Sequence, residues 1–136
     1  MNSFRKQLVI LVLGLAFLPS GCAPPATTAT LVGTYRIEHR VGAKSHGVET
    51  LVLHANGTYS QTFVPSRKGP TMTNTDTWSY RDGTIWLDNA LVVPDPILDI
   101  KQYPVEKTNV GMGVGTFGGI SFVKDADSSL YYRRVP

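Results

Sequence analysis

The chain has 136 residues, a formal net charge of +3 and a single cysteine. This length accommodates one domain of ordinary size and excludes a two-domain enzyme of typical dimensions. One cysteine excludes both an intramolecular disulfide framework and a zinc site built from several cysteines. The basic residues occur singly or in pairs, such as Arg67 with Lys68 and Arg133 with Arg134, and form no stripe with interleaved aromatics. We therefore expect no nucleic-acid partner.

The first 21 residues predict an export signal. Arg5 and Lys6 give a positive start, and residues 8–18 follow as an apolar run interrupted by no polar side chain. This run is too short to cross a bilayer as a helix, which needs about 20 residues. An unbroken apolar run also has no polar face to present to water, so a core helix is not expected. We therefore expect residues 1–21 to be a signal peptide.

Ser20, Gly21 and Cys22 close this segment, after Pro19. The pattern resembles a bacterial lipoprotein signal, in which small residues precede a cysteine that is lipidated and becomes the mature N-terminus; Pro19 stands where that family usually has leucine. The resemblance implies that Cys22 is the lipid attachment residue.

Residues 22–30 are small, uncharged and rich in Pro and Thr, which predicts an extended tether. Ala23, directly after the cysteine, resembles the sorting pattern of outer-membrane lipoproteins. The expected location is the bacterial cell envelope, with the chain anchored by lipid to the outer membrane and facing the periplasm if the cell is Gram-negative.

Residues 31–136 predict a single all-β domain. No stretch keeps an apolar period of 3.6, whereas alternation is common and Thr, Val and Tyr are frequent. Asn56–Gly57 and Asp82–Gly83 predict tight hairpin turns. The expected strands cover residues 34–41, 48–54, 59–64, 71–80, 85–87, 90–93, 116–124 and 130–135, with a long connection over 94–109. We expect a small antiparallel β-barrel of about eight strands, with a β-sandwich as the alternative.

Gly33, Thr34 and Tyr35 open the first strand and resemble the Gly-x-Trp start of lipocalins, with Tyr35 in the Trp position. The resemblance implies that an arginine of the last strand, Arg133 or Arg134, packs over that ring. Segments 49–61 and 77–89 also look like small, uncharacterised bacterial lipoproteins with lipocalin-like domains. The likeness implies a barrel that holds a small apolar molecule.

Large aromatic side chains are expected to fill the core of so small a domain. If the barrel instead contains a pocket, Tyr35, Trp78, Tyr80 and Trp86 are the residues expected at its wall. A lumen of a few hundred Å³ would favour a small ligand, whereas a filled interior would favour recognition on the surface.

No catalytic constellation is evident, and we expect neither an enzyme nor a cofactor. Residues 113–118 match the letters of a dinucleotide-binding glycine motif, but a strand-like segment follows where that site needs a helix, so a bend or bulge is expected. His39, His46 and His54 fall at separated positions, so no metal site is expected. A nucleophile elbow is also missing.

These observations predict a lipid-anchored envelope protein with a non-catalytic binding domain. Its ligand is expected to be a small apolar molecule in the barrel or an envelope component at the rim. The alternative is an inhibitor or immunity-type protein that blocks a periplasmic enzyme or toxin. Such a protein would act through the loop 65–70 or the acidic segment 76–99.

Overall fold

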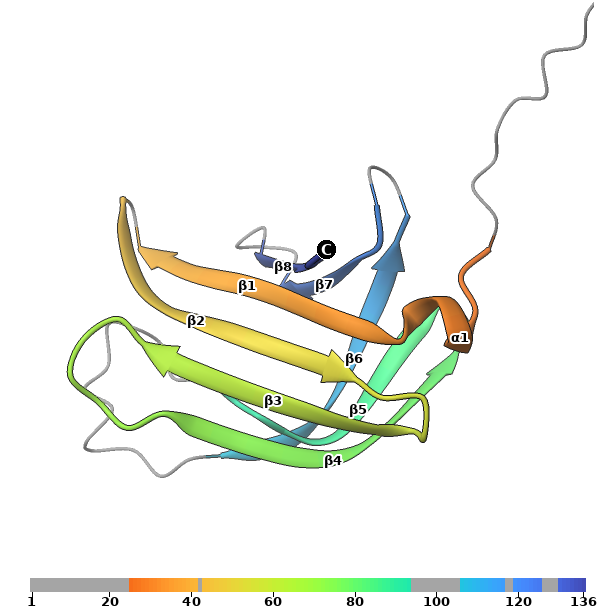
Figure 1. The fold of residues 1–136 in the computed structure, drawn as a ribbon, viewed down its shortest axis with the longest axis horizontal. Helices are drawn as coiled ribbons and strands as arrows, with labels where there is room; N and C mark the ends of the chain where they lie inside the picture. The colour runs from red at the N-terminus through yellow and green to blue at the C-terminus, as the bar shows by residue number, and fades with distance from the viewer. Residues whose placement is uncertain (1–24, 42, 94–105, 117–118, 126–129) are drawn as a thin grey trace, which may run out of the picture.

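The computed structural model describes residues 25–41, 43–93, 106–116, 119–125 and 130–136. Within these residues, eight antiparallel strands close into a barrel in the order β1-β2-β3-β4-β5-β6-β7-β8 (Figure 1). The predicted all-β barrel is confirmed. Neighbours in the barrel are also neighbours in the chain, apart from the closing pair of β1 and β8, so the sheet has an up-and-down topology.

The elements are, in chain order, α1 (Thr28–Leu31), β1 (Gly33–Val41), β2 (Lys44–Leu53), β3 (Thr58–Pro65), β4 (Met72–Arg81), β5 (Thr84–Leu91), β6 (Lys107–Gly115), β7 (Ser121–Asp125) and β8 (Leu130–Arg134). The helical turn α1 occupies the last part of the segment expected to be a tether. Thr27 caps it, with its hydroxyl oxygen accepting from the backbone N–H of Thr30. No helix in the described part of the chain is long and apolar enough to cross a membrane.

Both predicted hairpin turns are present, and glycine is needed in each. Asp82 and Gly83, between β4 and β5, take φ values of 52° and 73°, which is the conformation that a two-residue turn between twisted strands requires. Between β2 and β3 the positive φ, 81°, falls on Gly57. There the Asn56 side chain accepts a hydrogen bond from the Thr58 backbone N–H at 3.1 Å.

The prediction of separate strands at 85–87 and 90–93 is wrong, because a single strand, β5, covers Thr84–Leu91 and ends before residues 92 and 93. The pairing of β5 with β6 shifts register between Leu87 and Ala90. Asn89 takes a φ of 47° there, and its backbone N–H donates to Asn109 Oδ1 at 3.0 Å. The polar residues at this position therefore mark a β-bulge inside one strand.

The prediction of a connection up to residue 109 and a strand from 116 is also wrong. Strand β6 covers Lys107–Gly115, and β7 starts only at Ser121. The outward positions of β6 include Gly111 and Gly113, where an alternating strand would normally have polar side chains. The sequence of β6 therefore does not alternate between apolar and polar residues. A Cβ at Gly111 would lie 3.0 Å from the Trp86 ring, so glycine lets this indole lie flat against β6.

The two ends of the barrel differ. The start of β1, the β2–β3 turn and the β4–β5 turn lie beside α1, and we call this the α1 end (Figure 1). The β1–β2 and β3–β4 connections lie at the opposite end, which we call the loop end. Leu31 of α1 is completely buried and packs on the core from the α1 end.

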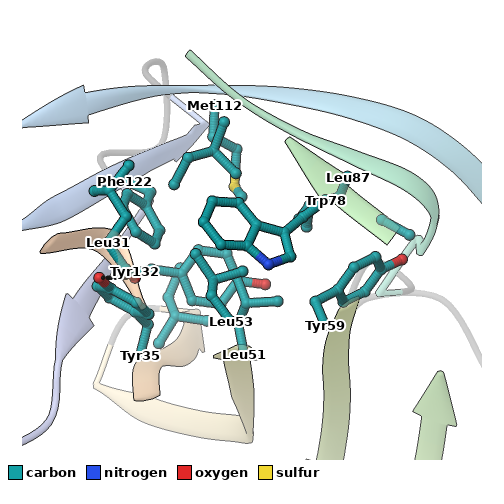
Figure 2. Close-up of a cluster of buried hydrophobic side chains, with 13 residues drawn as sticks. Leu31, Tyr35, Leu51, Leu53, Tyr59, Trp78, Leu87, Met112, Phe122 and Tyr132 are labelled. Atoms are coloured by element: carbon teal, nitrogen blue, oxygen red, sulfur yellow. Dashed lines mark hydrogen bonds between the residues drawn. The ribbon is translucent and has the colours of Figure 1, made fainter. Parts of the chain in front are cut away.

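The interior holds one large cluster of buried apolar side chains. The Trp78 indole lies in the middle of the cluster (Figure 2). The Tyr35 and Phe122 rings pack with their centroids 4.1 Å apart. The members are Leu31, Tyr35, Ile37, Leu51, Leu53, Tyr59, Trp78, Ile85, Leu87, Ala90, Met112, Phe122 and Tyr132.

Candidate functional site

The four aromatic residues expected at a pocket wall lie on two faces of the barrel. Tyr35 and Trp78 are buried in the core cluster, and the half-buried Tyr80 packs against it. Trp86 lies on the outer face with 37% of its surface exposed, and the Arg81 guanidinium lies 5.0 Å from its ring centroid. Three of the four therefore point inward, and their contact with a ligand stays a prediction.

Arg134 joins the last strand to the segment before the first strand. Its guanidinium lies 6.0 Å from the centre of the Tyr35 ring and donates to the backbone oxygens of Thr30 and Val32 at 3.0 and 2.7 Å. The Tyr35 hydroxyl donates to the Leu31 oxygen at 2.7 Å. Burial raises the pKa of Tyr35, which the Arg134 charge partly offsets. Of the two arginines considered from the sequence, Arg134 is the one beside the aromatic ring.

A polar cluster, which we call the Glu49 network, lies inside the barrel and consists of Glu49, His39, Gln61, Lys124 and Tyr132. The Glu49 carboxylate is fully buried, and its Oε2 lies 2.7 Å from His39 Nε2. The Lys124 ammonium donates to the same oxygen. Oε1 accepts from the Tyr132 hydroxyl and from Gln61 Nε2, the latter at 2.5 Å. Each residue comes from a different strand, so one carboxylate links five strands.

The partners of Glu49 keep its carboxylate ionised. Burial by itself would raise the pKa of Glu49, but the hydrogen bond from His39 and the charge and hydrogen bond of Lys124 lower this pKa from 4.5 to about 2. Burial and the nearby carboxylate raise the pKa of Tyr132 well above its usual value of 10. Tyr132 therefore keeps its proton and acts as a donor to an anion.

The network satisfies its own hydrogen-bonding groups. Among the described residues, no buried side-chain nitrogen or oxygen lacks a partner. The Gln61 amide also bonds the backbone of Leu91, accepting from its N–H at 2.7 Å and donating to its oxygen at 3.1 Å. This arrangement ties β3 to β5 across the interior. Its chemistry is that of a polar, cross-linked core, with no serine or cysteine nucleophile among its members.

Sequence reasoning missed most of this network. It considered His39 as a possible metal ligand, and it noted Glu49 only within a family resemblance. The sequence does contain one signal of the network. Glu49 is a charged residue on the face of its strand where Leu51 and Leu53 are buried. His54, by contrast, lies 3.1 Å from the Ser60 hydroxyl. The described residues contain no group of three or more candidate metal ligands.

The outer surface is hollowed where β1 meets β8, a place that we call the seam. Two adjoining hollows of about 430 and 490 Å³ share Arg36, Glu38 and Arg133 in their linings. The larger hollow is lined by Arg36, Ile37, Glu38, Arg40, Leu130, Tyr131 and Arg133. Both hollows are open to solvent, and the residues that they share are charged. The seam therefore offers a site for an external partner.

Comparison with known proteins leaves the barrel without an assigned family. No protein-family model, no curated protein and no solved structure matches the chain. The assignment of an eight-stranded closed barrel therefore rests on the strand pairing in the structure. The resemblance to lipocalins and to bacterial lipoproteins stays a prediction from the residues that carry it.

Proposed function

We propose that this chain is a lipid-anchored protein of the bacterial cell envelope, and that its barrel binds another envelope macromolecule without catalysis. The observation that carries the proposal is the hollowed seam between β1 and β8, with its exposed arginines. A partner at the seam would meet both charge and apolar surface, because Ile37, Leu130 and Tyr131 also line the larger hollow.

The packing of the interior supports surface recognition over carriage of a small apolar molecule. Tyr35, Tyr59, Trp78 and Tyr132 are large side chains that are at most 6% exposed, and all belong to the core cluster. The remaining polar interior is held by the Glu49 network. A carrier needs a lumen, whereas a packed core and a hollowed outer wall suit a protein that is recognised from outside.

The anchor part of the proposal rests on the sequence, since residues 1–24, with Cys22, lie outside the described residues. We expect the chain to incorporate radiolabelled palmitate in a bacterial host and the Cys22→Ala variant to incorporate none, because the acylated glycerol is attached through the cysteine sulfur, which alanine lacks. Ser20→Ala is the matched control: it keeps a small residue beside the cysteine and should be labelled like the parent. Label that persists in Cys22→Ala, or is absent from the parent, would contradict the anchor.

Surface recognition at the seam is testable by site-specific photo-crosslinking in the cells that produce the chain. Tyr131 at the seam and Trp86 on the other side of the barrel are each 37% exposed, so they form a matched pair. The photoreactive residue p-benzoylphenylalanine at Tyr131 should give a discrete protein adduct, and the same residue at Trp86 should give none. Adducts of equal yield from both positions, or none from Tyr131, would refute a partner at the seam.

Mass spectrometry of that adduct also distinguishes the two kinds of partner considered. A structural envelope component indicates a scaffold or adaptor. An enzyme or toxin whose activity falls when the purified chain is added indicates an inhibitor.

A further inference from the structure

Strand β1 is paired along its length on one side and along only a short part on the other. Its ladder with β2 runs from Gly33 to Val41, with one shift in register. Its ladder with β8 contains only Tyr35 and Arg36. In Figure 1 the β1–β2 hairpin, orange and yellow, continues well beyond the end of β8. Within the described residues, the part of β1 after Arg36 is therefore a strand edge without a ladder partner.

The hydrogen-bonding direction of this edge follows from the pairs that do form. The Thr34 oxygen accepts from the Val135 N–H at 2.9 Å, so the backbone groups of Thr34 point to the β8 side. Backbone groups of alternate residues in a strand point to the same side, so those of Arg36 and Glu38 do so too. The next pair in register would be Glu38 with Tyr131, and both line the larger hollow. The Glu38 N–H and C=O thus face that hollow.

The charge around this edge is unbalanced. Among the described residues, Arg36, Arg40 and Arg133 line the hollow together with a single acid, Glu38. Glu38 forms an ion pair with Arg40, in which Glu38 Oε2 lies 2.8 Å from Arg40 Nη2, and both side chains are well exposed. The lining therefore keeps a net positive charge, which favours an acidic partner. A second copy of the chain docked seam to seam would bring the same positive excess against itself.

We propose that the free edge of β1 accepts an extended acidic segment of the partner protein as an added strand. The inference rests on the proposed recognition at the seam and names the kind of segment recognised. Backbone hydrogen bonds to Glu38 would hold the segment, as in other cases of strand addition, and side chains at alternate positions would give specificity.

The alternation of β1 defines the sequence of such a segment. Arg36, Glu38 and Arg40 lie on the outer face of β1, and Ile37 lies on the inner face at 4% exposure. Side chains of the added strand on its outer face lie beside the arginines, and those on its inner face lie beside Ile37 and Leu130. The segment should therefore alternate acidic with aliphatic residues.

The test uses the purified full chain and a fluorescent octapeptide of alternating Asp and Val, with binding followed by anisotropy. The matched peptide has Lys in place of Asp. We expect the acidic peptide to bind at least about tenfold more tightly, and Arg40→Glu or Arg133→Glu to weaken it by about tenfold. Arg67→Glu, an exposed arginine in the β3–β4 loop, should leave the affinity unchanged. Equal binding of both peptides, or equal loss in all three variants, would overturn the proposal.

Backbone pairing is tested separately. Glu38→Pro removes the N–H that faces the hollow and should abolish binding, whereas Glu38→Ala keeps it and should bind at least as well as the parent. Proline can also disturb the strand itself, so a second experiment changes the peptide instead. Peptides N-methylated at every Asp or at every Val lack the backbone N–H groups along one edge of the peptide strand. Loss of binding with at least one of them supports an added strand, and parent-like binding of both overturns it.

These experiments distinguish failure of strand addition from failure of recognition at the seam. If the Tyr131 adduct forms but the acidic peptide fails to bind, recognition at the seam stands and strand addition is wrong. If the adduct also fails to form, both are wrong.

Discussion

Replacing Glu49 with alanine is expected to lower the free energy of unfolding by about 3–5 kcal/mol, the usual effect of removing one partner from a buried charged pair. The carboxylate is fully buried and receives hydrogen bonds from His39, Gln61, Lys124 and Tyr132. Its removal takes the shared acceptor from the Lys124 ammonium, His39 and Tyr132, and leaves Gln61 Nε2 with only the Leu91 oxygen. Urea unfolding followed by far-ultraviolet circular dichroism measures the change.

The exposed pair of Glu38 and Arg40 supplies the control for this experiment. Its two atoms are 2.8 Å apart, close to the separation of Glu49 and His39, but both side chains are well exposed. Surface pairs of this kind contribute little because water solvates each charge in their absence. Glu38→Ala should leave the urea midpoint nearly unchanged. A Glu49→Ala midpoint equally close to the parent would show that the network does not stabilise the barrel.

The same carboxylate sets the response of the fold to acid. The pKa of Glu49 is about 2 in the folded protein against an ordinary 4.5, so the unfolded chain takes up the proton first as the pH falls. A depressed pKa gives stability that is fully present above pH 4.5 and lost as the pH falls towards 2, about 3 kcal/mol in all. Glu49→Gln cannot titrate and should lack this part of the pH dependence.

The fold was predictable wherever the sequence alternated. In β1, the buried residues Tyr35, Ile37 and His39 alternate with the exposed charged residues Arg36 and Glu38, and the strand predicted over 34–41 is present. Alternation fails in β6, where outward glycines accommodate the Trp86 ring from β5. Trp86 and Gly111 are 25 residues apart, so the local pattern of β6 does not indicate this contact. The predicted total of about eight strands agrees with the structure because two errors cancel. The prediction divided β5 into two strands and missed β6.

The candidate site was harder to predict, for two reasons. The Glu49 network is assembled from five strands, and the bonded pair of Glu49 and Tyr132 is separated by 83 residues in the chain. The seam depends on where the β1–β8 ladder ends, and strand composition does not fix that position. Sequence reasoning identified Arg133 and Arg134 as a pair without distinguishing them. In the structure both arginines line the seam, and only Arg134 also lies over the Tyr35 ring.

The two tryptophans show the same limit within neighbouring strands. Ile85, Trp86 and Leu87 are all apolar, so their sequence does not indicate which of them points outward. In the barrel, Ile85 and Leu87 are buried and Trp86 is on the outer face, whereas Trp78 is 6% exposed inside. Replacing each tryptophan in turn therefore measures how much of the stability comes from filling the interior.

Trp78→Ala is expected to lower the free energy of unfolding by about 3–5 kcal/mol, since it removes the largest side chain of the core and leaves a cavity. It also deprives the His54 oxygen of the indole N–H that donates to it at 3.0 Å. Trp86→Ala should cost far less, because its ring is partly solvated and packs on the wall from outside. Circular dichroism in urea is again the measurement, as the tryptophan signal itself changes.

Free indole then tests whether the parent interior has room for a small apolar ligand. Added at millimolar concentration, indole should raise the urea midpoint of Trp78→Ala by occupying the vacated space, since apolar cavities of this kind bind aromatic molecules. The parent should not respond, because Trp78 already fills that volume. A parent that is stabilised as strongly as the variant would mean that the barrel holds a lumen next to its core. Carriage of a small apolar molecule would then replace surface recognition as the better account of its function.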